Sequence, residues 1–266
     1  MSNNSNGTSK LALLRQKRSI QKTNEDVDIE KAIDGFAMSI DTQKLMADIA
    51  QNSALVNLII DRSYSMIGTP EAIARELNEF AMRQAGKLYE TKLSITMFNI
   101  EVTSLFQNVT CKQFRISPWE CYDDTNIFDA VIVAITAVQK TDAYHKLHLV
   151  ITDGENIHSN HSLEEVRNLI HQRIQDGEHI FLLYNNEYDN SQETSKAYAE
   201  KLGIPVNNAV NFNRTGDGIK IIFQAIETLL DGLRSTGTVP KDWAKAIIAH
   251  NTNPLGIKAR ETKYLE

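Results

Sequence analysis

Oxygen-bearing side chains follow directly behind an apolar run near residue 60. Residues 55–60 (LVNLII) lead into the segment DRSYS, which contains Asp61, Ser63 and Ser65. One carboxylate and two hydroxyls are hard oxygen donors, the ligands that Mg²⁺, Ca²⁺ and Mn²⁺ prefer. Taken alone, the segment fits either a metal site or a turn, because Ser and Asp after a strand also cap turns.

A second apolar run has the same kind of ending. Residues 147–152 (LHLVIT) lead into Asp153 and Gly154, and runs of this length and composition are typical of buried parallel strands. Doubly wound sheets bind ligands beyond the carboxyl ends of their strands, where the strand order reverses. If the two runs flank this reversal, Asp61 and Asp153 converge there. The polar loop that precedes residue 127 can then add the hydroxyl of Thr125.

Together these segments resemble the von Willebrand factor A domain with a metal-ion-dependent adhesion site. The family pattern is Asp-x-Ser-x-Ser, then a distant Thr and a distant Asp. It is matched by Asp61, Ser63, Ser65, Thr125 and Asp153. The resemblance covers about residues 54–233. It implies that the two serines coordinate a divalent cation directly and that Thr125 joins them in the binding-competent state. It also implies that both aspartates act largely through water.

The loop before Thr125 departs from the family pattern. Family members often carry small residues there, commonly glycines, whereas this chain has Asp123 and Asp124. The two carboxylates leave the geometry of the loop and the net charge of the site open at the level of sequence.

Strand and helix patterns alternate from residue 54 onward. Apolar runs predict strands at 55–60, 92–99, 102–106, 147–152, 179–184 and 206–210, with 102–106 as an antiparallel edge strand. Apolar residues at helical spacing predict helices at 70–89, 127–138, 162–173, 191–202 and 218–233. Thr69 is the expected cap of the first helix, and Ser162 begins a capping box. The order predicts an α/β fold: a doubly wound, mostly parallel, Rossmann-like sheet with helices on both faces.

The predicted domain organisation has four parts. Residues 1–28 form a polar, flexible tail, and residues 29–53 form packing helices. Residues 54–234 form the von Willebrand factor A domain that the resemblance implies. Residues 235–266 form a tail with a short amphipathic helix that carries Trp243, Ile247 and Ile248. The sequence leaves two roles open for this helix, docking on the domain or binding a partner.

Composition limits the classes of partner. The 266-residue chain has a net charge of −6, which argues against nucleic acid because phosphate binding usually needs a basic face. Cys111 and Cys121 are too few for a disulfide framework. No signal segment or bilayer-spanning run is recognised, so we expect a cytoplasmic protein without a membrane partner. The oligomeric state is not predicted.

Two other kinds of site have weaker support. His145 with His148, and His158 with His161, form spaced pairs, but no Cys-x-x-Cys accompanies them as in many zinc sites. Phosphotransferases of the haloacid dehalogenase type need a second acid two residues after the nucleophile, where this chain has Ser63. No nucleophile elbow and no phosphate-binding glycine loop follow the first strand.

The sequence therefore predicts a non-enzymatic protein interaction module. A cation held mainly by neutral hydroxyls keeps much of its charge and can accept an Asp or Glu carboxylate from a partner protein. Mg²⁺ suits this arrangement, with Mn²⁺ or Ca²⁺ as alternatives. The resemblance implies an intracellular adaptor or assembly factor, a class that includes stress-resistance systems.

The competing interpretations are a metal-dependent phosphohydrolase that uses Asp61 and a structural domain with a degenerate site. Candidates for the rim of the metal face are Arg62, Tyr64, Trp119 and Tyr122. For Trp119 and Tyr122, packing of the loop under Thr125 is an equal alternative.

Overall fold

The computed structural model describes residues 40–154, 156–185 and 191–252. The chain divides into two compact units, with the boundary between Ala50 and Gln51. In the first unit, α3 (Ile40–Gln51) falls within the region predicted to form helices, and its Leu45 and Met46 side chains are exposed. The predictions for residues 1–39 and 253–266 lie outside the described residues. The division into four parts stays a prediction.

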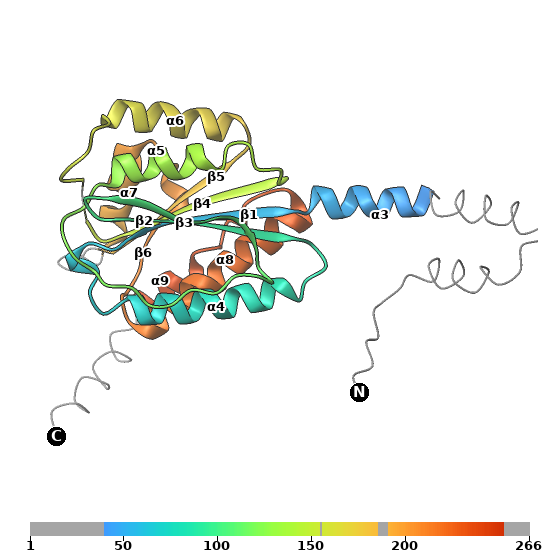
Figure 1. Cartoon of the computed structure of the whole chain (residues 1–266), viewed down its shortest axis with the longest axis horizontal. Coiled ribbons are helices and arrows are strands. Elements are labelled where there is room, and N and C mark those ends of the chain that lie inside the picture. Colours follow the sequence, from blue (N-terminus) through green and yellow to red (C-terminus); the bar gives the residue numbers. More distant parts are fainter. Residues whose placement is uncertain (1–39, 155, 186–190, 253–266) are drawn as a thin grey trace, which may run out of the picture. The chain divides into compact units, whose positions relative to one another are not determined.

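The second unit is built on one six-stranded sheet (Figure 1). Its strands are β1 (Ala54–Asp61), β2 (Thr91–Phe98), β3 (Val102–Thr110), β4 (His145–Thr152), β5 (His179–Tyr184) and β6 (Ala209–Asn211). They lie in the order β3-β2-β1-β4-β5-β6, with β3 antiparallel to β2 and all other neighbouring pairs parallel. The predicted mostly parallel sheet and its antiparallel edge strand are confirmed.

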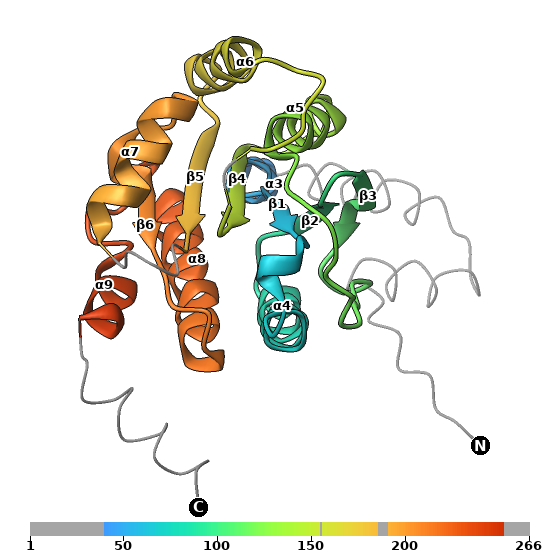
Figure 2. The same cartoon turned by 90° about the vertical axis from the view of Figure 1, so that its left-hand side faces the viewer.

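Helices cover both faces of this sheet (Figure 2). They are α4 (Pro70–Ala85), α5 (Ile127–Ala137), α6 (Leu163–Gln175), α7 (Gln192–Leu202), α8 (Gly216–Thr236) and α9 (Lys245–Asn251). One core lies under α4, α8 and α9, and the other lies under α5, α6 and α7. Side chains alternate along β1, so Leu58 and Ile60 enter the first core and Ile59 enters the second. Among the described residues, no helix has the length and apolarity needed to cross a membrane.

The helix caps were predicted with mixed success. Ser162 and Glu165 form the expected capping box, each side chain accepting a hydrogen bond from the other residue's backbone nitrogen. Thr69 occupies the N-cap position of α4 as predicted, but its side chain makes no capping bond. Its hydroxyl instead donates to the carbonyl oxygen of Met66 at 2.8 Å, which stabilises the short turn after β1.

Several element boundaries also differ from the prediction. β3 continues to Thr110, beyond residue 106. α4 ends at Ala85, short of residue 89, and is followed by Gly86, a weak helix former. Val206–Asn208 form a 3₁₀ turn after Pro205, which leaves β6 only three residues long.

The C-terminal segment, up to residue 252, packs against the sheet within the second unit. The Trp243 side chain is buried, and its ring lies edge-on to Phe181 with 5.1 Å between ring centroids. Its indole Nε1 donates to the carbonyl oxygen of Asn207 at 3.0 Å. Ile247 is buried as well, whereas Ile248 is 39% exposed. Of the two roles left open by the sequence, the structure supports docking on the domain.

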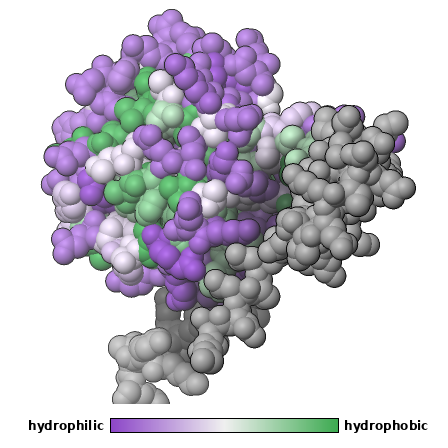
Figure 3. All heavy atoms as spheres, turned by 45° about the vertical axis from the view of Figure 1, so that its right-hand side comes forward, coloured by the Kyte–Doolittle hydropathy of each residue, from purple (hydrophilic) through white to green (hydrophobic). Residues whose placement is uncertain are grey.

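The open edge of the sheet is formed by β3. Every side chain of this strand is exposed or half-buried, and Leu105 is among the exposed large apolar residues. On the face that Figure 3 brings into view, green apolar residues gather between purple polar ones.

Candidate metal centre

The predicted ligands lie where the strand order reverses. β1 is flanked by β2 on one side and by β4 on the other: the chain runs outward from β1 through β2 to β3, then crosses back past β1 and continues from β4 in the opposite direction. Ile60 is in parallel register with Ile151, and therefore Asp61 and Asp153 follow at the same edge of the sheet. Figure 2 looks onto this edge, with the strand ends toward the viewer. The fold thus produces the convergence expected at a switch point.

Asp61 is fully buried and held by two donors. Its Oδ1 accepts the backbone N–H of Ser63 at 2.8 Å, and its Oδ2 accepts the hydroxyl of Thr152 at 2.6 Å. Burial raises the pKa of the Asp61 carboxyl to about 6, although both hydrogen-bonding partners lower it, and the charge of Asp153 raises it further. A cation beside this carboxylate would offset the cost of burying its charge.

The serine hydroxyls and Asp153 form a continuous series of contacts. Ser63 Oγ lies 3.1 Å from Ser65 Oγ, and Ser65 Oγ donates to Oδ1 of Asp153 at 2.6 Å. A hydroxyl that gives its proton to a carboxylate keeps its lone pairs for another partner. Ser65 therefore offers a neutral oxygen of the kind that a hard cation coordinates.

Thr125 reaches the same place from a third segment. Its side chain is buried, and its Oγ1 lies 3.0 Å from the position that a Cβ on Gly154 would occupy. A side chain at position 154 would crowd this hydroxyl, so glycine suits the position after Asp153. The structure thus brings all five predicted ligand residues together, from the ends of β1 and β4 and from the loop before α5.

Asp123 accounts for the departure from the family pattern. Its φ is 62°, in the left-handed region that favours glycine. Its carbonyl oxygen accepts the backbone N–H of Tyr64 at 2.9 Å, which ties the loop to the serine segment. Asp adopts this conformation more readily than most residues that carry a Cβ. The loop therefore keeps a glycine-like backbone with a carboxylate added to it.

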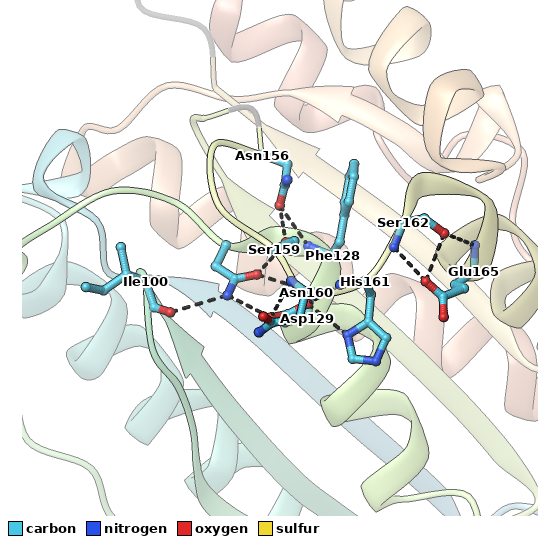
Figure 4. Close-up of polar contacts among 10 residues, drawn as sticks. Ile100, Phe128, Asp129, Asn156, Ser159, Asn160, His161, Ser162 and Glu165 are labelled. Atoms are coloured by element: carbon cyan, nitrogen blue, oxygen red, sulfur yellow. Dashed lines mark hydrogen bonds and ion pairs between the residues drawn. The ribbon is translucent and has the colours of Figure 1, made fainter.

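A polar cluster around Asp129 fastens the loop after β4 to the start of α5 (Figure 4). The Asp129 carboxylate accepts the backbone N–H groups of Asn160 and His161, both at 3.0 Å, and the Asn160 side chain at 2.9 Å. His161 Nδ1 and Asn126 Nδ2 lie 2.8 and 3.0 Å from its oxygens. Burial would raise the pKa of Asp129, but these hydrogen bonds outweigh burial and hold the pKa well below its usual range.

This cluster positions Thr125 relative to Asp153. Asp129 lies one helical turn after Thr125, and the loop that it holds begins just after Asp153. The same loop also bonds directly to Thr125, whose carbonyl oxygen accepts the backbone N–H groups of Ile157 and His158 at 2.9 and 3.3 Å. Asp129 could have been noticed in the sequence as an acid in the first turn of a helix. Its partners could not, because they lie about thirty residues further along the chain.

Histidines of the spaced pairs have structural partners. His148 is buried within β4, with Nδ1 3.0 Å from the Asn57 side chain and Nε2 2.8 Å from Glu178. His158 Nε2 lies 3.4 Å from a carboxylate oxygen of Asp124. Within the described part of the chain, no group of three or more His, Cys, Asp or Glu side chains could hold a metal ion. The centre around Asp61 is of a different type, because three of its five predicted ligands are hydroxyls.

Arg214 is a site residue that the sequence did not reveal. It lies in the loop between β6 and α8, and its Nη1 donates to Oδ2 of Asp153 at 2.7 Å and to the backbone carbonyl oxygen of Ser65. A positive charge thus already compensates one of the two carboxylates. The signal that could have pointed to it was its place just beyond the carboxyl end of a parallel strand.

The donor set fits a divalent cation of the Mg²⁺ type. The hydroxyls of Ser63, Ser65 and Thr125 would coordinate it directly. Asp61 and Asp153 would contribute negative charge through bridging water molecules. Two observations support the fit. The buried Asp61 carboxylate is held by the neutral donors Ser63 and Thr152, and the Ser65 hydroxyl has its proton committed to Asp153.

Comparison with known proteins identifies the fold. No family model and no curated protein matches the sequence. The vWF domain of the type V pili tip protein Mfa5 from Porphyromonas gingivalis is 10% identical, with a TM-score of 0.50 over 66% of this chain and 95% of that chain. The pilus adhesin SpaC from Lactobacillus rhamnosus GG, in an open conformation, is 10% identical, with a TM-score of 0.52 over 67% of this chain and 30% of that chain.

A third solved structure is proximal thread matrix protein 1 from the mussel byssus, with a zinc-occupied MIDAS motif. It is 14% identical, with a TM-score of 0.49 over 65% of this chain and 44% of that chain. This chain therefore spans less than half the length of that protein. At these identities the likenesses to Mfa5 and SpaC establish the fold alone.

Replacing Asp123 with glycine tests the backbone of the loop. Because Asp123 has a positive φ, Asp123→Gly should raise the free energy of unfolding by about 0.5–1 kcal/mol. Asp124→Gly is the matched control, and it should lower stability by a similar amount, since Asp124 has no positive φ to relieve. Urea unfolding measures both variants, and equal effects would contradict the assignment of strain to Asp123.

The raised pKa of Asp61 predicts a pH dependence of the metal-free protein. The folded state keeps the proton up to about pH 6, whereas the unfolded chain loses it near 3.8. Stability from this group is therefore present at low pH and is lost as pH rises from 4 to 7, by on the order of 3 kcal/mol. Urea unfolding in EDTA should show this loss in the wild type relative to Asp61→Asn. Parallel pH profiles for the two proteins would contradict it.

Proposed function

We propose that this chain, which has the von Willebrand factor A fold, binds a partner protein through a divalent cation and carries out no catalysis. Ser63, Ser65 and Thr125 would coordinate the cation, with Asp61 and Asp153 acting through water. Mg²⁺ is the proposed ion, and Mn²⁺ and Ca²⁺ are alternatives. The partner would supply an Asp or Glu carboxylate.

The observation that carries this proposal is the series of contacts from Ser63 through Ser65 to Asp153, beside the buried Asp61. A cation held by neutral hydroxyls supplies an electrophilic site for an outside carboxylate. The residues of the chain keep that site in place. Asp61 is fixed by Thr152 and by the backbone of Ser63, and Ser65 is fixed by Asp153.

A phosphohydrolase that uses Asp61 has less support. A carboxylate that attacks a phosphoryl group must be accessible, whereas Asp61 is fully buried and both of its oxygens accept hydrogen bonds. Ser63 stands where that chemistry needs a second acid. Burial and fixed orientation suit a residue that holds a site together.

The finer parts of the functional prediction rest on the family resemblance. These are the adaptor or assembly role, the link to stress resistance and the cytoplasmic location, and they stay predictions. A structural domain with a degenerate site is the remaining alternative. It predicts that the chain binds no divalent cation, so one titration separates it from the proposal.

Calorimetric titration with Mn²⁺ and Mg²⁺ tests the proposal directly. The wild type should bind one cation, and the Asp61→Asn and Ser63→Ala/Ser65→Ala variants should bind it about 10–100-fold more weakly. Asp231→Ala is the control, because it removes an exposed carboxylate of α8 that pairs with Lys87. This variant should bind the cation like the wild type. If the folded wild type gives no metal-dependent heat, the proposal is contradicted.

The position of Arg214 makes a further prediction about cation affinity. Its charge lies against Asp153, so Arg214→Gln should bind Mn²⁺ about tenfold more tightly because a repelling charge is removed. Arg214→Lys keeps the charge and should resemble the wild type. Arg62→Gln is the second control, since Arg62 is on the same face but contacts Asn99 and Glu101. Weaker binding by Arg214→Gln would show that Arg214 supports the site instead of opposing the cation.

A further inference from the structure

We infer that the loops around the metal centre form a docking surface for a protein segment of defined chemistry. The segment has a central Asp or Glu, large apolar side chains next to it, and Lys or Arg further out. This inference rests on the proposed function, because the central acid is the residue that the cation would bind. It adds the chemistry of the residues on either side.

Large apolar side chains are exposed on the loops at the carboxyl edge of the sheet. Their exposed fractions are between 40% and 70%, and they are Tyr64, Ile67, Ile100, Tyr122 and Ile157. Exposed apolar residues that occur singly are ordinary, but several gathered around one site indicate an interaction surface. We call this set the apolar rim.

Hydrogen bonds tie the apolar rim to the metal-site segments. Tyr64 lies between the two serines, and the backbone N–H of Ile67 donates to its carbonyl oxygen at 3.2 Å. The backbone N–H of Ile157 donates to the carbonyl oxygen of Thr125 at 2.9 Å. The carbonyl oxygen of Ile100 accepts the side chain of Asn126, the residue after Thr125, at 3.3 Å (Figure 4). The rim is therefore part of the same rigid face as the ligands.

Tyr122 is held in place within the rim. Its backbone N–H donates to the carbonyl oxygen of Arg62 at 3.1 Å, and the Arg62 guanidinium lies 5.1 Å from the centre of its ring. A fixed aromatic ring loses little freedom on binding and suits an interface anchor. Trp119, predicted alongside it as a rim residue, is instead half-buried against the first core.

Negative charge lies around the apolar rim. Glu101 and Asp124 have side chains that are 72% and 58% exposed, and Asp123 adds a third carboxylate on the same loops. Away from the cation and from Arg62, which lies 3.9 Å from Glu101, these carboxylates disfavour a second acidic residue on the partner. Charge complementarity therefore places the acid of the partner at the centre and favours basic residues at its margins. The same outer charge disfavours nucleic acid and anionic membranes.

A displayed library of random nonapeptides tests the inference, with selection on the full chain in Mg²⁺ and in EDTA. Peptides enriched only in Mg²⁺ should share one Asp or Glu, with Ile, Leu, Phe, Tyr or Trp within two positions of it. Further acidic residues should be depleted, and Lys or Arg should be enriched toward the ends. Acidic peptides without apolar neighbours would overturn the inference and leave the proposed function standing.

Substitution of the rim separates its role from that of the ligands. Tyr64→Ser/Ile157→Ser should bind a selected peptide at least tenfold more weakly, while its Mn²⁺ affinity stays within twofold of the wild type. Leu88→Ser/Tyr144→Ser is the matched control, since both residues are 66% exposed but precede strands at the opposite end of the sheet. Unchanged peptide binding in the rim variant would overturn the inference. Failure of the wild type to bind Mn²⁺, with no peptides dependent on Mg²⁺, would overturn the proposed function as well.

Discussion

The fold brings two carboxylates, Asp61 and Asp153, to the same edge of a buried sheet. Their proximity determines which groups can surround them. Neighbouring parallel strands force the two residues together, and both burial and the nearby charge of Asp153 disfavour the charged form of Asp61. Hydrogen-bond donors surround both carboxylates. Asp61 accepts the Thr152 hydroxyl and the Ser63 backbone amide. Asp153 accepts the Ser65 hydroxyl and the Arg214 guanidinium. A site that collects donors around paired negative charge is also a site suited to a cation.

Much of the fold and the ligand set could be predicted because the signals are local. Continuous apolar runs marked β1 and β4 as central strands, and the residue after each run had to lie at the carboxyl edge. The order of strands and helices then limited the topology to few choices. The grouping of the five predicted ligand residues followed from short segments at these strand ends and from the family resemblance that they carry.

The rest could not be predicted because it depends on contacts between distant segments. Arg214 and Ser65 are 149 positions apart, and no local pattern links them. Thr69 has the right type and place for a helix cap, but its backbone lies in the αR region instead of the extended region typical of caps, and its hydroxyl accepts no capping bond. The φ of Asp123 is likewise invisible in the sequence, because the two adjacent aspartates differ only in what their backbones contact.

The loop from residue 156 to residue 161 has a thermodynamic consequence for recognition. It has no regular secondary structure, yet Asp129 holds the backbone at Asn160 and His161, and Thr125 holds it at Ile157 and His158. Ordering a free chain costs roughly 1–2 kcal/mol per residue. Because this loop is already ordered in the folded protein, it loses little conformational entropy when a partner binds. Encounter with a partner should therefore resemble the docking of two preformed surfaces, with rates set by diffusion and orientation more than by loop closure.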